Sequence, residues 1–438
     1  MPDELTTTDH AHRPDRPDIP ALTGLRFYAA FFVLIAHGCA ALLAVHETPD
    51  GAIYWIRQAS GFGMTLFFVL SGFVIHYNYA DLVTGAGVKG IGSYLWARFA
   101  RLYPLFLLMM LIYFLVSSRH IDYWTGHAER LSSIFRALPY FLFSVQSWFY
   151  VVIDGNPLLD AIGGASPITW SISTEWFFYF LYLAFVWLVL KLRTPLVALL
   201  IILLWCLVWT AIASGLYNRI DQINAWAVAR FGPVADIGER PQDSFVRWLL
   251  YFSPYLRLGE FVLGALVAQL YTRLRSVRVS TLENSAGAAG FVAAAASAVA
   301  ATYVEYSPNV GTTILREMNM NFALAPSATL LIFCAARYRG AIFRPLTCRP
   351  VMVLGEASYS IYLVHLVMLT AAARLLAPAA HGILDDVAEL LLITIIIFLI
   401  SIALYAFYEA PARKLLRGLW YYRQKPEQSG ARSQPLTS

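Results

Sequence analysis

Charged residues are scarce in this chain. Only 13% of its 438 residues are Asp, Glu, Lys or Arg, whereas an ordinary soluble domain carries about 25%. Apolar residues make up 59% of the sequence, and apolar runs of about 20 residues, each long enough to cross a bilayer, recur from Pro20 to Tyr408. These proportions exclude a soluble globular protein. They predict an all-α, polytopic transmembrane helical bundle embedded in the lipid bilayer.

Cysteine motifs, a basic patch and a signal peptide are also missing. The four cysteines are scattered and form no C-x-x-C pair of the kind that binds zinc. The net charge of +5 is not gathered into a basic stripe with interleaved aromatic residues. The first 20 residues are polar and contain no apolar core, so we expect no removable signal peptide. We therefore expect neither a metal site nor a nucleic-acid partner.

About ten membrane spans are predicted from apolar windows bounded by charges, proline or glycine. An additional apolar stretch, Ile134 to Val151, contains Arg136 and Pro139, so we expect a re-entrant or interfacial segment there. The predicted spans lie near residues 21–44, 62–79, 95–116, 168–190, 195–216, 248–271, 285–304, 320–336, 351–373 and 386–408.

Lysine and arginine are unevenly distributed between the two sides of these spans. With the N-terminus in the cytoplasm, 20 of them lie on the inner side and 9 on the outer side, which predicts that both termini are cytoplasmic. We expect a polar N-terminal tail over 1–20, a transmembrane domain over 21–415 and a disordered C-terminal tail over 416–438. No internal repeat is visible, which disfavours a transporter built from inverted halves.

Arg26 and His37 are two ionisable residues inside the first predicted span. Their separation of eleven residues rotates a helix by about three turns plus 20°, so both lie on one face, about 16 Å apart along the axis. An ionisable side chain inside a span costs a few kcal/mol, which indicates a partner or a function. For an isolated pair, a snorkelling arginine and a hydrogen-bonded buried histidine are the more common interpretation, and the polar residues of the other spans change that balance.

Two short patterns follow in the second and third spans. The Ser71-Gly72 step permits close helix approach or leaves room for a ligand. Arg98 and Arg101, three residues apart at the cytoplasmic end of the next span, form a fork that suits phosphate. Anchoring at the inner membrane surface predicts the same two arginines.

Carboxylates occur in the fourth and sixth spans. Glu175 lies one turn after Ser171 at the predicted extracytoplasmic end, among aromatic residues, where a carboxylate is costly unless it is paired. Arg257 and Glu260 are spaced as an i,i+3 ion pair, for which a structural and a functional role are equally open.

The last two spans carry the remaining polar residues. Ser358, Tyr362 and His365 follow the i, i+4, i+7 pattern of one helix face, which we expect to line a cavity. Glu409 and Arg413 are four residues apart, and we interpret them as the structural end of a helix.

Taken together, these segments resemble the acyltransferase 3 family of polytopic membrane acyltransferases, which modify extracytoplasmic glycans and related acceptors in bacteria. The resemblance covers about residues 20 to 415 in the family's order. The motifs that carry it are Arg26-x10-His37, Phe67-Phe-Val-Leu-Ser71-Gly72, Arg98-x-x-Arg101-x-x-Pro104, Trp170-Ser-Ile-Ser-Thr-Glu175, Arg257-x-x-Glu260-Phe-x-x-Gly264, Gly355 to His365, and Tyr408-Glu409-x-Pro411.

The resemblance implies a multi-pass enzyme of the bacterial cytoplasmic (inner) membrane that uses acyl-CoA as its donor. Acetyl-CoA is the expected donor, and no tightly bound cofactor is expected. The acceptor is expected to be a hydroxyl of an extracytoplasmic glycan, lipid-linked sugar or glycoside. The acyl group, the acceptor and the oligomeric state are left open.

The resemblance also implies roles for individual residues. His37 is the expected catalytic residue, supported by Arg26 and Glu175, while Arg98 and Arg101 are expected to contact the donor's phosphates. Other residues are expected to bind the donor or to support the substrate and the site, namely Ser71, Gly72, Ser171, Ser173, Arg257, Glu260, Ser358, Tyr362 and His365.

Three positions depart from the family's pattern. Trp176 follows Glu175 where the family often carries a second carboxylate, Glu356 stands where lysine is common, and Val364 stands where tryptophan is common. We also expect no additional extracytoplasmic hydrolase-like domain.

A mechanism follows from the predicted topology. The arginines are expected near the cytoplasm, with His37, Glu175 and His365 in the outer half, so that the extended arm of CoA bridges the distance. Imidazole titrates near neutral pH and suits proton transfer from a hydroxyl. Direct transfer and a transient acyl-histidine are both open.

Two other classes of protein fit the polar residues. A proton-coupled transporter or a lipid or glycan flippase would use His37 and Glu175 as a proton relay. A non-catalytic membrane scaffold would depend on no single polar residue.

Overall fold

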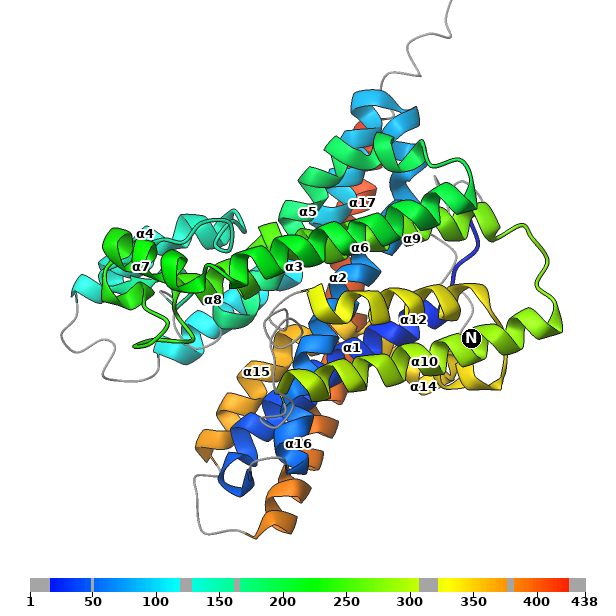
Figure 1. The fold of residues 1–438 in the computed structure, drawn as a ribbon. Coiled ribbons are helices and arrows are strands. Elements are labelled where there is room, and N and C mark those ends of the chain that lie inside the picture. Colours follow the sequence, from blue (N-terminus) through cyan, green and yellow to red (C-terminus); the bar gives the residue numbers. More distant parts are fainter. Residues whose placement is uncertain are drawn as a thin grey trace, which may run out of the picture.

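The computed structural model describes residues 16–48, 51–118, 128–160, 166–306, 322–375 and 382–424. The predicted tails over 1–20 and 416–438 lie largely outside these ranges. Within them the chain is almost entirely helical (Figure 1). The exception is a hairpin of two-residue strands, in which β1 (Val152–Ile153) pairs antiparallel with β2 (Asn156–Pro157). The predicted all-α membrane bundle is therefore confirmed apart from this hairpin.

The longer helices follow one another through the whole chain. In order they are α1 (Pro20–Leu42), α2 (Ala52–Gly85), α3 (Gly87–Ser118), α4 (Ala128–Leu142), α5 (Ser166–Leu190), α6 (Pro195–Tyr217), α7 (Ile220–Phe231), α9 (Pro254–Leu274), α10 (Thr281–Tyr306), α12 (Ala325–Arg337), α14 (Arg349–Glu356), α15 (Ser358–Leu375), α16 (Ile383–Leu404) and α17 (Ala410–Gln424).

Each predicted span overlaps at least one helix, and the span predicted over 351–373 overlaps both α14 and α15. Not every one of these helices is long and apolar enough to cross a membrane. Seven described helices are, or eight if α14 and α15, which meet at a bend of 73°, form one broken span. Of the others, α9 carries the charges of Arg257, Glu260 and Arg273, and α12 has only 13 residues. The described part of the chain thus supports a multi-pass membrane protein with seven or eight spans by length and composition, against the ten predicted.

Proline marks the starts of several helices. Pro20, Pro195 and Pro254 each stand in the first turn, where the missing N–H would be unsatisfied anyway. The hydroxyl of Thr194 accepts a hydrogen bond from the Val197 N–H and caps α6. These local signals explain why the boundaries of α1, α6 and α9 fall where they do.

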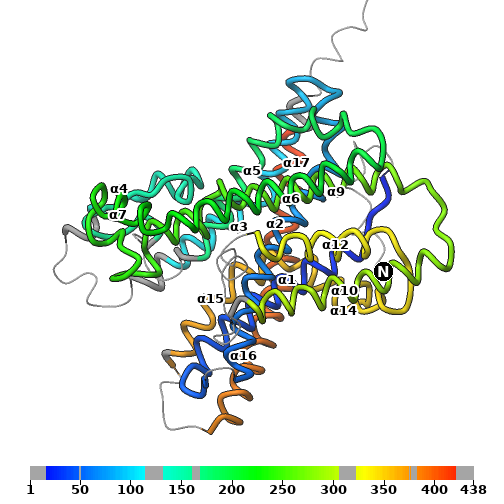
Figure 2. Tube along the Cα trace, in the orientation of Figure 1, coloured from blue at the N-terminus to red at the C-terminus, as the bar shows by residue number. Residues whose placement is uncertain are grey.

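Helices α2 and α9 pack closely near the middle of the bundle, with α1 and α6 beside them (Figure 2). The contact depends on two facing glycines. A Cβ on Gly72 would lie 1.9 Å from the Phe261 carbonyl oxygen, and one on Gly264 would lie 2.0 Å from the Val69 carbonyl oxygen. The two backbones can approach this closely only because neither position carries a side chain.

The segment predicted to be re-entrant or interfacial begins within α4. This helix is amphipathic and ends at Leu142, so it is too short to cross a bilayer. Ala137 and Phe141 are buried on one face, whereas Phe135 and Phe143 are exposed. Together with α7, α4 lies at one side of the bundle, away from α16 (Figure 1).

The C-terminal region continues as helix beyond the last predicted span. A π-helical turn, η8 (Tyr405–Glu409), connects α16 to α17. Because α17 runs to Gln424, the first part of the tail predicted to be disordered is helical. The Trp420 ring stacks on the Trp96 ring of α3 at 5.4 Å between centroids, and this contact holds α17 against the bundle.

Candidate active site

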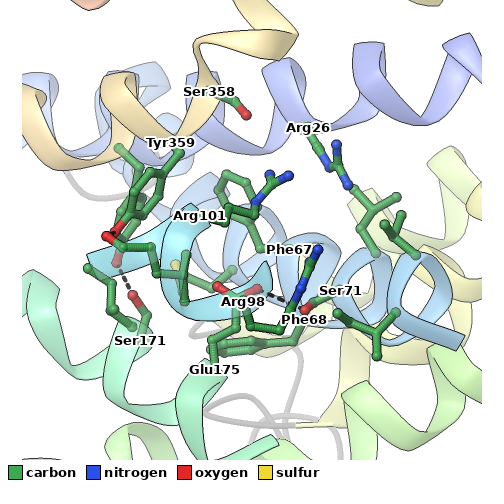
Figure 3. A pocket seen from close by; sticks show the side chains of 17 residues that line it. Arg26, Phe67, Phe68, Ser71, Arg98, Arg101, Ser171, Glu175, Ser358 and Tyr359 are labelled. Atoms are coloured by element: carbon green, nitrogen blue, oxygen red, sulfur yellow. Dashed lines mark hydrogen bonds between the residues drawn. The ribbon is translucent and has the colours of Figure 1, made fainter. Parts of the chain in front are cut away.

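A cavity of about 80 Å³ lies where α1, α2, α3, α5 and α15 meet, and we call it the Glu175 cavity (Figure 3). Its apolar walls include Met64, Phe67 and Phe68. The polar residues that line it are Arg26, Ser71, Arg98, Arg101, Ser171, Glu175, Ser358, Tyr359 and Tyr362. Eight of the fourteen predicted site residues therefore line this cavity, namely Arg26, Ser71, Arg98, Arg101, Ser171, Glu175, Ser358 and Tyr362.

Glu175 is held by two hydroxyl groups. Its Oε1 atom accepts hydrogen bonds from Ser71 Oγ at 2.9 Å and from Tyr179 Oη at 2.5 Å. It shares the cavity with Arg26 and Arg98. The expectation that Glu175 lies with His37, apart from the arginines, is therefore wrong, because α5 brings its carboxylate to the cavity that α1 and α3 line with guanidinium groups.

Arg98 is the most deeply buried of these arginines, with only 5% of its surface exposed. Its Nη2 donates to the Tyr79 hydroxyl, and its guanidinium lies 4.3 Å from the centroid of the Tyr79 ring. A cation over an aromatic face is stabilised by the ring's quadrupole. This contact fixes Arg98 in place and leaves its side chain beside the cavity.

A second cavity of about 360 Å³, the arginine cavity, adjoins the first. Arg26, Arg98 and Arg101 line both cavities, and their side chains surround the Glu175 cavity in Figure 3. Five arginines line the second cavity, namely Arg26, Arg98, Arg101, Arg413 and Arg417. The two cavities therefore share a wall of positive charge.

His37 lies elsewhere, in contact with His365. The Nδ1 atom of His37 is 2.9 Å from Nε2 of His365, and the two rings are parallel to within 1°. Their centroids are 5.2 Å apart, as expected for rings that meet edge to edge through a hydrogen bond. Neither histidine lines the Glu175 cavity or the arginine cavity.

The surroundings of His365 determine where the protons of this pair lie. His365 is fully buried, and its Nδ1 atom is 2.5 Å from the Tyr362 carbonyl oxygen. Because a carbonyl only accepts, Nδ1 of His365 must carry the proton and Nε2 must accept. With both rings neutral, Nδ1 of His37 donates, and Nε2 of His37 keeps its lone pair. His37 is thereby held as the tautomer that can act as a base or a nucleophile.

Tyr362 stands between the histidine pair and the Glu175 cavity. It lines the cavity, and its ring centroid is 5.7 Å from that of His365. Its hydroxyl lies 2.7 Å from Ser171 Oγ and donates to the Ile168 carbonyl at 3.1 Å. The residues of the predicted polar face of α15 therefore reach two places. Ser358 and Tyr362 line the Glu175 cavity, whereas His365 contacts His37.

Some predicted site residues have structural contacts instead. Gly72 faces the backbone of α9. Ser173 is buried and accepts hydrogen bonds from the backbone and the hydroxyl of Ser147. Arg257 and Glu260 form an ion pair at 2.9 Å, with 1% and 0% of their side chains exposed. None of these four lines the Glu175 cavity.

Several residues at the site escaped the sequence analysis. Tyr79 accepts a hydrogen bond from Arg98, and Tyr179 donates one to Glu175. The contact between Tyr79 and Arg98 joins two helices, so residue spacing within one helix could not predict it. Arg413 was interpreted as a helix end paired with Glu409. In the structure Glu409 instead accepts a hydrogen bond from Ser360 at 2.7 Å, and Arg413 lines the arginine cavity.

Among the described residues, no three His, Cys, Asp or Glu side chains are placed to hold a metal ion.

Comparison with known proteins identifies the family of the chain. The chain is 25% identical over 362 residues to an acyltransferase, MdmB, from Streptomyces mycarofaciens, and the match covers 82% of this chain and 81% of the relative. No solved structure matches the chain. The model of a family described as an acyltransferase domain matches residues 19–406. The chain therefore belongs to the acyltransferase 3 family and is an acyltransferase.

Proposed function

We propose that this enzyme transfers an acyl group, acetyl in the simplest case, from cytoplasmic acyl-CoA to a hydroxyl of an extracytoplasmic glycan, lipid-linked sugar or glycoside. It would act as a multi-pass protein of the bacterial inner membrane. The observation that carries the proposal is the ordered pair of His37 and His365, which leaves Nε2 of His37 with its lone pair.

In this mechanism His37 moves one proton. Nε2 takes the proton of the acceptor hydroxyl while the hydroxyl oxygen attacks the thioester carbonyl carbon. The new C–O bond forms, the C–S bond breaks, and the CoA thiolate takes up the proton from His37. A two-step path is also open. Nε2 first attacks the thioester carbonyl carbon and the C–S bond breaks, which gives an acyl-imidazolium and the CoA thiolate; the acceptor hydroxyl then attacks the acyl carbon, the C–N bond breaks, and the hydroxyl proton passes to the thiolate.

The two cavities suit the donor. Guanidinium groups bind phosphates through paired, charge-assisted hydrogen bonds, and five arginines line the larger cavity. The smaller cavity continues from them toward Tyr362. The donor's nucleotide would occupy the arginine cavity and its pantetheine arm the Glu175 cavity, with the thioester approaching His37 past the Tyr362 side chain.

The proton-coupled transporter has no comparable support. A relay between His37 and Glu175 requires the two groups to be linked, yet His37 contacts His365 and Glu175 contacts Ser71 and Tyr179. These contacts favour acyl transfer over a proton relay.

CoA release tests the proposal directly. The purified protein in proteoliposomes would be given acetyl-CoA, with and without a crude cell-envelope glycan fraction, and free CoA would be measured by chromatography. We expect release that requires the glycan and that His37→Ala abolishes. His46→Ala is the matched control, because His46 bonds Asp386 at the end of the bundle, away from both cavities. Glycan-dependent release by His37→Ala at the wild-type rate would overturn the assignment.

A further inference from the structure

The last described helix contributes to the arginine cavity. Helix α17 follows the π-helical turn η8, and π-helical turns occur frequently at functional sites. It packs on α3 through the stacked rings of Trp96 and Trp420, and Trp96 Nε1 donates to the Leu416 carbonyl at 2.8 Å. The helix is therefore fixed relative to α3, which carries Arg98 and Arg101.

Two arginines of α17 reach the arginine cavity because the helix is held in this position. Arg413 and Arg417 are one turn apart, and both line the arginine cavity. Arg417 Nη2 donates to the Tyr79 hydroxyl at 3.3 Å, the same hydroxyl that accepts from Arg98. Tyr79 thus links an arginine of α3 to one of α17 along the same wall.

The cavity holds more cationic groups than its own acids neutralise. Its lining carboxylates are those of Asp18, Glu356 and Glu409, against five guanidinium groups. Within the described ranges, Arg26, Arg101 and Arg413 form no hydrogen bond or ion pair with a protein group. Charged side chains inside a bundle are costly unless they are paired. The unmatched guanidinium groups therefore favour an anionic ligand with several phosphates.

We propose that Arg413, with Arg417 beside it, binds the phosphates of the donor's nucleotide, so that α17 forms one wall of the donor site. This inference rests on the proposed function, since it takes acyl-CoA as the donor. Both arginines lie beyond residues 19–406, the part of the chain that the family model matches. Arginine suits this role because its planar fork binds phosphate oxygens in pairs.

The test compares donors with and without phosphates. The full-length protein in zwitterionic bilayers would be assayed with acetyl-CoA and with acetyl-pantetheine, which keeps the thioester arm and lacks all phosphates. We expect Arg413→Gln to raise KM for acetyl-CoA about 10-fold, with kcat unchanged, because one charge-assisted contact is lost. Its kinetics with acetyl-pantetheine should match those of the wild type.

Lys414→Gln provides the matched control. Lys414 is the next residue on the same helix, is exposed, and does not line the cavity, so its KM for acetyl-CoA should not change. Equal kinetics for Arg413→Gln and Lys414→Gln would overturn the proposal. An equal loss with both donors would also overturn it, because a merely structural role would affect them alike.

A binding measurement separates this proposal from the proposed function. Adenosine 3′,5′-bisphosphate, which carries no acyl group, should bind the wild type and Lys414→Gln with equal affinity. It should bind Arg413→Gln about 10-fold more weakly. If the bisphosphate binds in this way but no acyl transfer is found, the nucleotide site is supported and the proposed function is refuted. If acyl transfer is found but the bisphosphate does not bind in this way, the proposed function stands and the nucleotide site is refuted. Binding of inorganic phosphate but not of the bisphosphate would assign the site to free phosphate. An effect of Arg413→Gln only in bilayers that contain phosphatidylglycerol would assign it to lipid headgroups. Either result would overturn the proposed nucleotide site.

Discussion

Nδ1 of His37 and Nε2 of His365 lie 2.9 Å apart, although 328 residues separate them in the chain. His365 in turn faces the Tyr362 carbonyl through its Nδ1 atom. The chain of donors and acceptors runs in one direction only, from the His37 N–H to His365 and from the His365 N–H to the carbonyl. A backbone carbonyl of α15 therefore determines which nitrogen of His37 keeps its lone pair.

Replacing His365 should slow the chemical step. His365→Leu removes the acceptor of the His37 N–H, so His37 loses its fixed tautomer, and we expect kcat to fall about 100-fold with KM for the donor unchanged. His365→Gln should recover part of the loss, because its amide oxygen can accept the same hydrogen bond. Steady-state kinetics in proteoliposomes, with thermal unfolding as a measure of folding, would check both variants.

Recovery by glutamine distinguishes positioning from simple packing. If His365 only fills space, leucine and glutamine should preserve activity according to how well each packs, and leucine should be the better replacement. Normal kcat for His365→Leu would contradict the assigned tautomer.

The same residues show what the sequence can predict. Helical spacing places Ser358, Tyr362 and His365 on one face of α15, and all three are at or beside the site. Spacing within one helix cannot show that His365 meets His37, because that contact depends on how α15 packs against α1. It also cannot show that α5 turns Glu175 toward the arginines, and for this reason its predicted depth was wrong.

The fold was predictable to a similar extent. Long apolar runs and prolines located α1, α6 and α16 to within a few residues. The charged α9, the short α12 and the bend between α14 and α15 were each predicted as a full span. Hydropathy could not distinguish α9 and α12, which bury most of their residues inside the bundle, from helices that cross a membrane.

Gly72→Ala should destabilise the bundle. The new Cβ would lie 1.9 Å from the Phe261 carbonyl oxygen, which forces α2 and α9 apart, and overpacking of this kind costs about 1–3 kcal/mol. Gly61→Ala is the control on the same helix, because a Cβ there meets nothing within 4 Å. Thermal unfolding in detergent should show a lower Tm for Gly72→Ala and an unchanged or higher Tm for Gly61→Ala. Equal Tm values would contradict the close approach of the two helices.

Arg257→Leu should also destabilise the protein, because it leaves the buried Glu260 carboxylate without its cation. Removing one partner of a buried ion pair costs about 3–5 kcal/mol. The double variant Arg257→Leu, Glu260→Leu removes both charges and should recover much of the lost stability. Comparing Tm values of the single and double variants measures this; a double variant less stable than Arg257→Leu would argue that the two residues act independently.

Glu175 can be tested by separating its charge from its hydrogen bonds. Glu175→Gln keeps an oxygen that accepts from Ser71 and Tyr179, so we expect a stable fold with acyl transfer reduced about 10-fold or more if the carboxylate takes part in the site. Glu175→Leu leaves both hydroxyls unsatisfied and should lower the free energy of unfolding by about 1–3 kcal/mol. Full activity in Glu175→Gln would restrict Glu175 to a structural role.

The contact between Tyr362 and Ser171 has a consequence for the cell's energy supply. In the proposed transfer across the bilayer, a continuous water path between the arginine cavity and the histidine pair would conduct protons, and each charge that crosses dissipates about 2.3 kcal/mol per 100 mV of membrane potential. The Tyr362 side chain, whose hydroxyl lies 2.7 Å from Ser171 Oγ, lines the Glu175 cavity and contacts the His365 ring. Under the proposed function, this side chain would separate the arginine cavity from the histidine pair and so limit proton leakage during acyl transfer.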